Sequence, residues 1–361
     1  MRLVSTTSIQ AGAILGQTIY RDNGTVLLQK GMNLTARLVS RLQDQGITYV
    51  YIEDEATKDI VVKSAISEKL RHEATSSMKQ LFTDVRKSEM LSNSFVLDKE
   101  AKSLTDIIQR IMEEINDHEE SLTLLTDVYL TDDYIFQHSL NVTIYALAIG
   151  AELKLNAKEL SDLGKGAMLH DIGKVFIDPN ILQKPDKLTK KEFEIMKTHT
   201  TIGYDLLRQN YNYSSVIAHC AYQHHERLNG TGYPRGLEGK DIHPFAQIIS
   251  VADVFDAVTS NRVYRKAMLP HEGLELLYSG AVDQFDIKMV EAFKNSVAVY
   301  PNGITVELND QRQGVVVRQN KHLCDRPVIR IIKDGMNNPV EPYTVDLSNQ
   351  LNITITKCNL G

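Results

Sequence analysis

The sequence predicts a multidomain protein in which a central all-α domain is flanked by a small N-terminal α/β module and a small C-terminal all-β module. Three observations support this prediction. Residues 1–60 combine a hairpin signal with one short helix, residues 128–298 read as consecutive helices, and residues 299–361 contain short β-rich runs separated by turns. A chain of 361 residues, 42% of them hydrophobic, is long enough to bury more than one core.

The N-terminal module, residues 1–60, is predicted from its turn and cap signals. Residues 21–24, Arg-Asp-Asn-Gly, separate two short apolar runs, which is typical of a β-hairpin. Thr35 is a suitable N-cap for a short amphipathic helix that ends at Gly46, and residues 49–52 form a closing strand. The module contains no cluster of chemically active residues, so we expect it to have a docking or sensory role.

Residues 61–127 are charged and nearly free of Gly and Pro, which indicates a helical linker. It carries an apolar stripe at helical spacing. The stripe consists of Ile107, Ile108, Ile111, Met112 and Ile115. It is either the seam of a homodimer or a face that packs on the next domain, and we favour packing because the repeat is too short for a coiled coil.

The two remaining units differ in texture. Residues 128–298 are predicted to be helical, with loops marked by Pro and Gly. After Tyr300-Pro301 the chain becomes rich in β-branched residues. The predicted strands lie at 306–308, 315–317, 328–332 and 353–355. The sequence of this last module indicates no site.

Composition excludes several classes of function. A net charge of -6 provides no general basic field for a DNA or RNA polymer or for an anionic membrane. Cys220, Cys324 and Cys358 are widely spaced and are expected to be free thiols in a reducing compartment. No run approaches the roughly 20 apolar residues of a membrane span. We therefore expect a soluble, cytoplasmic protein without a transmembrane segment.

The chemistry of the sequence is concentrated in the helical region, where five of the eleven histidines and two aspartates occupy positions that make sense together. The seven residues are His138, His170, Asp171, His199, His224, His225 and Asp253. A lone helical histidine is more often a core or surface residue than a ligand, so the joint occurrence carries the prediction. Imidazole and carboxylate together suit Fe, Mn or Zn better than Ca or Mg. Seven ligands suit two ions if Asp171 bridges them.

The residues around these ligands resemble a known family. Residues 170–174 read His-Asp-Ile-Gly-Lys, residues 224–236 read His-His-Glu-Arg-Leu-Asn-Gly-Thr-Gly-Tyr-Pro-Arg-Gly, and residues 253–264 read Asp-Val-Phe-Asp-Ala-Val-Thr-Ser-Asn-Arg-Val-Tyr. Together they resemble the HD-GYP subfamily of HD-domain phosphohydrolases, over about residues 128–295. Both ends of the chain are similar to modules found beside this domain in some members, which assigns them no function.

The resemblance implies an HD-type helical catalytic domain with two divalent metal ions, Fe²⁺ or Mn²⁺. One ion is expected to be held by His138, His170, Asp171 and Asp253. The other is expected to be held by Asp171, His199, His224 and His225.

The resemblance also implies hydrolysis of cyclic di-GMP to pGpG or GMP, which would lower the level of this second messenger. Asp171 and Lys174 are the expected catalytic residues, and Lys174, Tyr233, Arg262 and Arg265 are expected to contact substrate. Two alternatives stay open: a hydrolase of another cyclic dinucleotide such as cyclic GMP-AMP, and a cyclic-dinucleotide-binding scaffold with little turnover. The presence of all seven ligands favours catalysis.

Two positions depart from the family pattern. Asn229 stands where the family usually has Asp, and it preserves the turn chemistry. Tyr134 stands one helical turn before His138, where some members place a Glu that helps to bind a third metal, and Asp132 and Asp133 lie at the wrong helical offset to replace it. The sequence therefore predicts two ions.

The terminal modules are expected to tune or localise the activity, with a signalling partner of their own and with residues 61–127 as the physical link. On this view, a fragment of residues 100–298 should fold, bind metal and retain activity.

Overall fold

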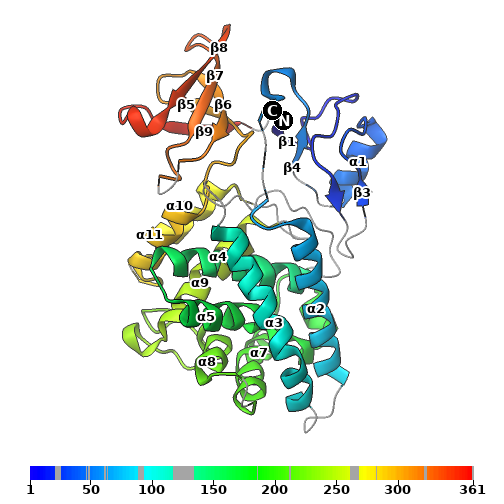
Figure 1. Cartoon of the computed structure of the whole chain (residues 1–361), viewed down its shortest axis with the longest axis vertical. Helices are drawn as coiled ribbons and strands as arrows, with labels where there is room; N and C mark the ends of the chain where they lie inside the picture. Colours follow the sequence, from blue (N-terminus) through cyan, green and yellow to red (C-terminus); the bar gives the residue numbers. More distant parts are fainter. Residues whose placement is uncertain are drawn as a thin grey trace.

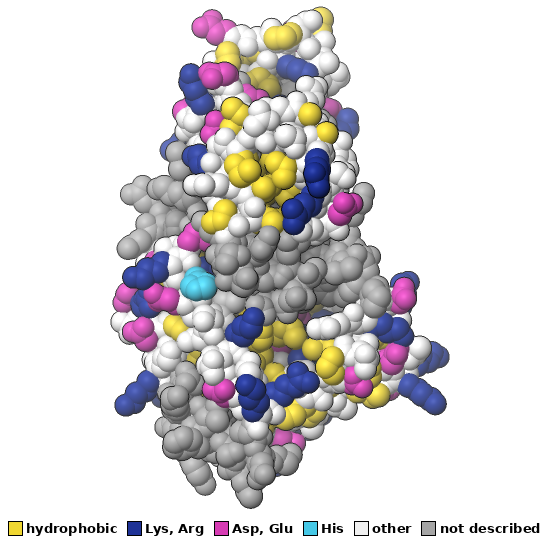
Figure 2. All heavy atoms as spheres, turned by 90° about the vertical axis from the view of Figure 1, so that its right-hand side faces the viewer, with side chains coloured by type: hydrophobic (Ala, Val, Ile, Leu, Met, Phe, Trp, Pro, Cys, Tyr) yellow, Lys and Arg dark blue, Asp and Glu magenta, His cyan; other side chains and the backbone are white. Residues whose placement is uncertain are grey.

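The computed structural model describes most of the chain. The described residues are 1–20, 26–45, 47, 49–60, 62, 64–87, 93–116, 134–184, 186–210, 213–260, 268–281, 283–320 and 323–359. Figure 1 shows an elongated molecule with the two small β-containing modules at one end and the helices at the other. On the face in Figure 2, basic and acidic side chains are interspersed, in keeping with the net charge of -6.

The N-terminal module has the predicted α/β composition. Strand β1 (Arg2–Ser5) pairs antiparallel with β4 (Tyr49–Ile52), and β2 (Ile19–Tyr20) pairs antiparallel with β3 (Val26–Leu28). Helix α1 (Ala36–Asp44) packs Val39 and Leu42 into a small core of its own. Its predicted N-cap is confirmed, because the Thr35 hydroxyl accepts a hydrogen bond from the Leu38 amide at 3.3 Å. The hairpin turn at residues 21–24 and Gly46 lie outside the described residues.

The predicted helical region is confirmed and extends toward the N-terminus. Its helices are α2 (Glu68–Lys87), α3 (Asn93–Asn116), α4 (Tyr134–Glu152), α5 (Ala157–Leu169), α6 (Pro179–Leu182), α7 (Lys190–Arg208), α8 (Ser215–Gln223), α9 (Pro244–Thr259), α10 (Pro270–Gly280) and α11 (Ile287–Ser296). A short 3-10 segment, η3 (Ile172–Phe176), follows α5 directly. Helix α4 is buried over most of its length and packs against α5, α9 and α11.

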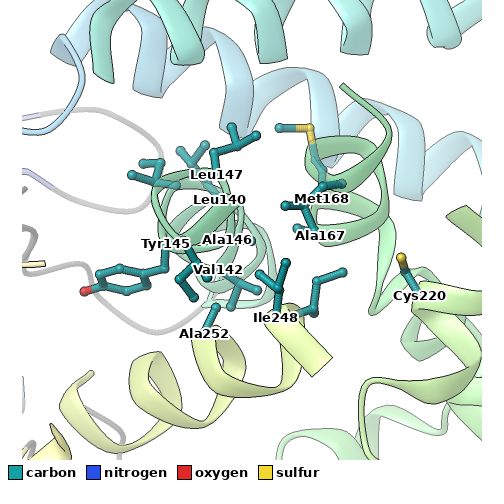
Figure 3. Packing of buried hydrophobic residues seen from close by; sticks show 14 of the residues in the cluster. Leu140, Val142, Tyr145, Ala146, Leu147, Ala167, Met168, Cys220, Ile248 and Ala252 are labelled. Atoms are coloured by element: carbon teal, nitrogen blue, oxygen red, sulfur yellow. The ribbon is translucent and has the colours of Figure 1, made fainter. Parts of the chain in front are cut away.

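One hydrophobic core joins α4, α5, α8 and α9. Figure 3 shows Leu140 and Leu147 of α4 facing Met168 of α5, with Ile248 and Ala252 of α9 below them. The same core includes the apolar faces of α2 and α3. Buried residues of α7, α10 and α11 also belong to it, so this core holds the helical region together.

The apolar stripe of α3 packs within the chain. Ile107, Ile108 and Ile111 are buried, while Met112 and Ile115 are partly buried against the same core. Helix α3 approaches α5 closely, because a Cβ on Gly164 would lie 2.8 Å from Cγ2 of Ile108. The interpretation of the stripe as a packed face is thus confirmed.

The C-terminal module is a five-stranded antiparallel sheet, as its all-β prediction requires. The strand order is β8-β7-β6-β5-β9. The strands are β5 (Thr305–Leu308), β6 (Gln313–Arg318), β7 (Val328–Lys333), β8 (Pro339–Asp346) and β9 (Ile355–Asn359). The predicted strands match β5, β6 and β7, whereas the last strand begins at Ile355 and not at Ile353. Strand β8 was missed because it contains prolines, which β-sheets tolerate on edge strands such as this one.

The two terminal modules contact each other. The Leu3 amide donates to the Gly303 carbonyl at 2.9 Å, and the buried Tyr51 hydroxyl donates to the Asn302 carbonyl at 2.9 Å. No helix among the described residues is both long enough and apolar enough to cross a membrane. The three cysteines, all within the described part of the chain, form no disulfide.

Candidate metal centre

Helix α4 supplies His138, the first of the predicted ligands. The helix is predominantly apolar, and its neighbours α5 and α9 cover it, so the His138 side chain is 3% exposed. A buried imidazole requires polar partners. Its Nε2 lies 3.1 Å from Asp253 Oδ1 on α9, which crosses α4 at this point.

The end of α5 supplies the adjacent pair His170 and Asp171. The start of this helix is fixed by a capping box between Asn156 and Glu159, and His170 is its C-cap. The chain then turns into η3, which lies against α7 at very short range. A Cβ on Gly173 would be 2.0 Å from the His199 carbonyl oxygen, so only glycine allows this approach. The close contact brings His199 to Asp171.

Helix α7 supplies His199, and the end of α8 supplies His224 and His225. The buried Nδ1 atoms of three site histidines face backbone carbonyls. His170 Nδ1 is 2.7 Å from Ala167 O, His199 Nδ1 is 2.6 Å from Met196 O, and His224 Nδ1 is 3.0 Å from Ala221 O. Since these Nδ1 atoms act as donors, the Nε2 atoms are left to bind a metal ion.

Asp171 lies between two groups of ligand atoms. Its Oδ2 is 3.3 Å from His170 Nε2 and 3.7 Å from His138 Nε2. Its Oδ1 is 3.4 Å from His199 Nε2 and 3.8 Å from His224 Nε2. Each oxygen therefore faces a different set of histidines, which is the arrangement expected of a bridging carboxylate.

The outer ligands complete the two groups. Ligand atoms of Asp171, His199, His224 and His225 lie within 4.8 Å of one another, as do those of His138, His170 and Asp171. Asp253 approaches both groups, because its Oδ1 is 3.1 Å from His138 and its Oδ2 is 3.7 Å from His225 Nδ1. The structure thus brings together all seven predicted residues, with Asp253 between the groups rather than beside His138 alone.

The residues present fit divalent metal ions. Two donors about 2.1 Å from one ion, at angles of roughly 90–110°, lie about 3.0–3.4 Å apart, and the shorter distances around Asp171 fall in this range. His170 Nε2 and Asp171 Oδ1 are buried and have no hydrogen-bond partner among the described residues. Buried polar atoms without partners are costly, and a metal ion would satisfy both of them. The site can therefore hold divalent cations.

The electrostatics favour an ionised Asp171 and neutral imidazoles at His199 and His224. Burial opposes ionisation of Asp171, but the charges of His170 and Lys174 hold its pKa well below the usual value. Burial lowers the pKa of His199 to about 4, and it lowers the pKa of His224 well below its ordinary value. These protonation states are the ones that metal ligands need.

His138 behaves differently. Burial opposes its protonation, yet hydrogen bonds to Asp253 and Asp256 raise its pKa to about 9. A proton on Nε2 would compete with a metal ion, so metal binding at His138 should release a proton.

A loop after α8 borders the metal centre. Glu226, 2% exposed, accepts hydrogen bonds from the Arg235 amide at 2.8 Å and the Leu237 amide at 2.9 Å, which fixes the path of the loop. Gly232 is required there, because its Cβ would lie 2.4 Å from the Glu226 Cα. The loop places the Tyr233 ring 4.6 Å from the His225 ring. Tyr233 is therefore beside the metal centre.

Of the cationic residues predicted to contact substrate, Lys174 lies at the metal centre, whereas the two arginines are not described. The Lys174 ammonium lies 2.6 Å from Asp171 Oδ2 and is one-fifth exposed, so it reaches the edge of the metal centre. Arg262 and Arg265 lie outside the described residues, as do Asp132 and Asp133. Tyr134 is the first residue of α4, and its side chain is also outside the description.

Two residues of the site were not predicted from the sequence. Asp256 contacts Nδ1 of His138, the ring nitrogen that does not face the metal centre, and Glu226 fixes the loop that carries Tyr233. Asp256 follows Asp253 by three residues on one helix, which places both carboxylates on one face. That spacing was the available signal for Asp256.

Family models and known proteins match much of this chain. A family model described as an HD domain matches residues 102–289, and a model described as a KOW domain associated with the HD domain matches residues 305–359. The chain is 30% identical over 292 residues to the cyclic di-GMP phosphodiesterase PA4108 of Pseudomonas aeruginosa, covering 78% of this chain and 68% of that protein. It is 34% identical over 245 residues to a cyclic di-GMP phosphodiesterase of Thermotoga maritima, covering 66% and 65% respectively.

A relative named for a different substrate is also similar. The chain is 33% identical over 172 residues to the 3'3'-cGAMP-specific phosphodiesterase 3 of Vibrio cholerae, covering 48% of this chain and 37% of that protein. Among solved structures, the HD-GYP-type protein Bd1817 from Bdellovibrio bacteriovorus aligns with a TM-score of 0.47 and 19% identity, over 81% of this chain and 97% of that one. The HD model covers more than half of the chain. This chain therefore belongs to the HD domain family, and its resemblance to the HD-GYP type is confirmed.

Proposed function

We propose that this protein is a metal-dependent phosphodiesterase that hydrolyses cyclic di-GMP to pGpG or GMP. One observation carries the proposal. The two oxygens of Asp171 face separate sets of histidines, so one buried carboxylate serves two ligand groups. Paired sites of this kind suit an in-line displacement at phosphorus.

We assign two ions to the site, Fe²⁺ or Mn²⁺, because the donors are imidazole and carboxylate. One is held by His138, His170, Asp171 and Asp253. The other is held by Asp171, His199, His224 and His225. When bound, such ions neutralise phosphate charge and lower the pKa of water toward neutrality.

The surrounding side chains bind and orient the substrate. Lys174 stabilises negative charge on the phosphate at the edge of the centre. Tyr233 provides a ring on which a base can stack, and the exposed Phe193 ring lies 6.1 Å from it, edge to face. Arg262 and Arg265 are assigned to the guanine edge or to phosphate, for which the planar guanidinium is suited.

The choice of cyclic di-GMP is supported by the similarity to cyclic di-GMP phosphodiesterases of Pseudomonas aeruginosa and Thermotoga maritima. A second candidate substrate is 3'3'-cGAMP, because the Vibrio cholerae relative is specific for it. The complete ligand set argues against a scaffold that only binds nucleotide.

The test is an assay of the full chain, loaded anaerobically with Fe²⁺ or with Mn²⁺, against cyclic di-GMP and 3'3'-cGAMP. We expect linear product from cyclic di-GMP at the higher kcat/KM and no product from the Asp171→Ala variant. Faster hydrolysis of 3'3'-cGAMP would replace the proposed substrate. Nucleotide binding by metal-loaded protein without turnover of either compound would contradict the proposed activity.

A further inference from the structure

A buried arginine of α2 begins a chain of polar contacts that ends at the metal centre. Arg71 is 2% exposed, although arginine is among the residues least often buried. It lies on the face of α2 that packs against α4, between the buried residues Leu70 and Ala74. Its Nη1 donates to Asn141 Oδ1 of α4 at 3.4 Å.

Asn141 is held in one orientation by its neighbours. Its Oδ1 also accepts from Gln137 Nε2 at 3.1 Å, and its Nδ2 donates to Asp256 Oδ1 at 2.9 Å. The amide oxygen therefore faces donors, while the amide nitrogen faces the carboxylate of Asp256. Arg71, Gln137 and Asp256 would each lose a hydrogen bond if the amide rotated by 180°.

Asp256 of α9 joins this chain to a metal-site histidine. It is 1% exposed, and its Oδ2 lies 2.7 Å from His138 Nδ1. Its other oxygen accepts from Asn141 and from Ser260 Oγ, the latter at 3.1 Å. A carboxylate that accepts from Nδ1 fixes the tautomer and ring orientation of a ligating histidine and makes Nε2 a stronger donor to metal.

We propose that Asp256 is a positioning residue for the metal centre, and that Asn141 and Arg71 connect it to α2. The inference rests on the proposed metal-dependent function. Asp256 and Asn141 orient His138. The position of α2 on α4 therefore affects the metal affinity of the ligand group formed by His138, His170 and Asp171. Helix α2 follows the N-terminal module in the chain, so the polar chain gives that module a physical route to the metal centre.

The test measures Mn²⁺ affinity of the full chain by equilibrium dialysis, together with the Tm without metal and its rise on adding Mn²⁺. In Asp256→Asn, the amide oxygen can still accept a hydrogen bond from His138 Nδ1. The amide nitrogen then faces Asn141 Nδ2, which is also a donor, so that hydrogen bond is lost. We expect one of the two ions to bind about 10–100-fold more weakly. The Tm rise should shrink accordingly, and the exposed control Asp241→Asn should behave as wild type.

Arg71→Met tests the connection to α2. It keeps the apolar stem, and Gln137 still donates to Asn141, so the network loses its cation without losing every donor. We expect a smaller loss of Mn²⁺ affinity in the same direction, up to about tenfold, and no loss for Lys69→Met on the exposed face of α2. Equal affinities for Arg71→Met and Lys69→Met would overturn the connection to α2.

A double variant, Asp256→Asn with Asn141→Asp, separates positioning from general stability. The new carboxylate on α4 can accept from the new amide on α9, from Arg71 and from Gln137, while the oxygen of that amide accepts from His138. We expect this exchange to regain part of the Mn²⁺ affinity lost in Asp256→Asn. A metal-free Tm that falls while Mn²⁺ affinity stays constant, or an exchange variant that regains nothing, would overturn the positioning role. Wild-type protein that binds neither Mn²⁺ nor Fe²⁺ would refute the metal site itself and this inference with it.

Discussion

Substituting Gly173 by alanine should damage the metal centre without touching a ligand. The added Cβ would lie 2.0 Å from the His199 carbonyl oxygen, whereas real Cβ atoms keep at least 3.0 Å from such neighbours, so η3 and α7 must separate by about 1 Å. A misplacement of about 1 Å can cost roughly a hundredfold in rate. Overpacking costs a further 1–3 kcal/mol or so of stability. We therefore expect turnover to fall about a hundredfold, with weaker Mn²⁺ binding at the His199 group.

The control is Gly31→Ala in the N-terminal module. Gly31 has a φ of +84° and no atom within 4 Å of an added Cβ, so alanine there is strained but displaces nothing. It should cost about 1–2 kcal/mol of stability and leave Mn²⁺ affinity and turnover unchanged. Turnover and metal affinity of Gly173→Ala within twofold of wild type would refute the argument that this contact sets the position of His199.

Three further predictions address the site and the terminal modules. Asp171→Ala should abolish turnover and lower the affinity for both ions in a Mn²⁺ titration. Arg262→Ala should keep its metal but lose about 1.5–3 kcal/mol of substrate binding, which corresponds to a rise of roughly ten- to hundredfold in KM. Elemental analysis should find two ions per chain, since Tyr134 is no carboxylate ligand, and three tightly held ions would contradict this. The hydrogen bond to Arg330 lowers the pKa of Asp59 to about 2, so any stability from this pair is complete above about pH 4 and is lost as the pH falls through 2. Because Asp59 is largely exposed, Asp59→Asn should cost at most about 1 kcal/mol in a Tm measurement.

The seven proposed ligands could be predicted from the sequence because their identity and local flanks are recorded in the chain itself. Their partners could not be found in the same way. Asp256 reaches His138, and Asn141 reaches Asp256, only because α9 crosses α4 at that level. A sequence pattern states which face of a helix a residue occupies, but the crossing that pairs two faces is a property of the tertiary packing.

The strands show a second limit. The β-branched runs of β5, β6 and β7 are buried and were predictable, whereas residues 339–346 carry two prolines and few apolar side chains. This segment forms β8 because β7 provides a partner strand, and at the sheet edge the missing amides of proline cost little. Tertiary context therefore overrode the local signal.

Helix α2 revises the expectation that residues 100–298 form a self-sufficient fragment. Its sequence is charged, yet it inserts a continuous stripe into the main core. The stripe consists of Leu70, Ala74, Met78, Leu81, Phe82 and Val85, each at most 2% exposed. The Phe82 ring packs edge to face on Phe136 of α4 at 5.3 Å.

The loss of one such contact is already severe. Truncating a buried phenylalanine to alanine costs about 3–5 kcal/mol, a large part of the roughly 5–15 kcal/mol that stabilises a domain. A fragment that lacks α2 altogether leaves the matching faces of α3 and α4 exposed to water. We therefore propose that the helical unit begins near residue 62, and we expect a fragment of residues 62–298 to unfold cooperatively in calorimetry and to bind Mn²⁺. The fragment of residues 100–298 should aggregate or melt without a cooperative transition. If the shorter fragment instead unfolds cooperatively with the same Tm as the longer one, α2 contributes nothing to the stability of the core. The proposed connection from Arg71 of α2 to His138 would then have no structural basis.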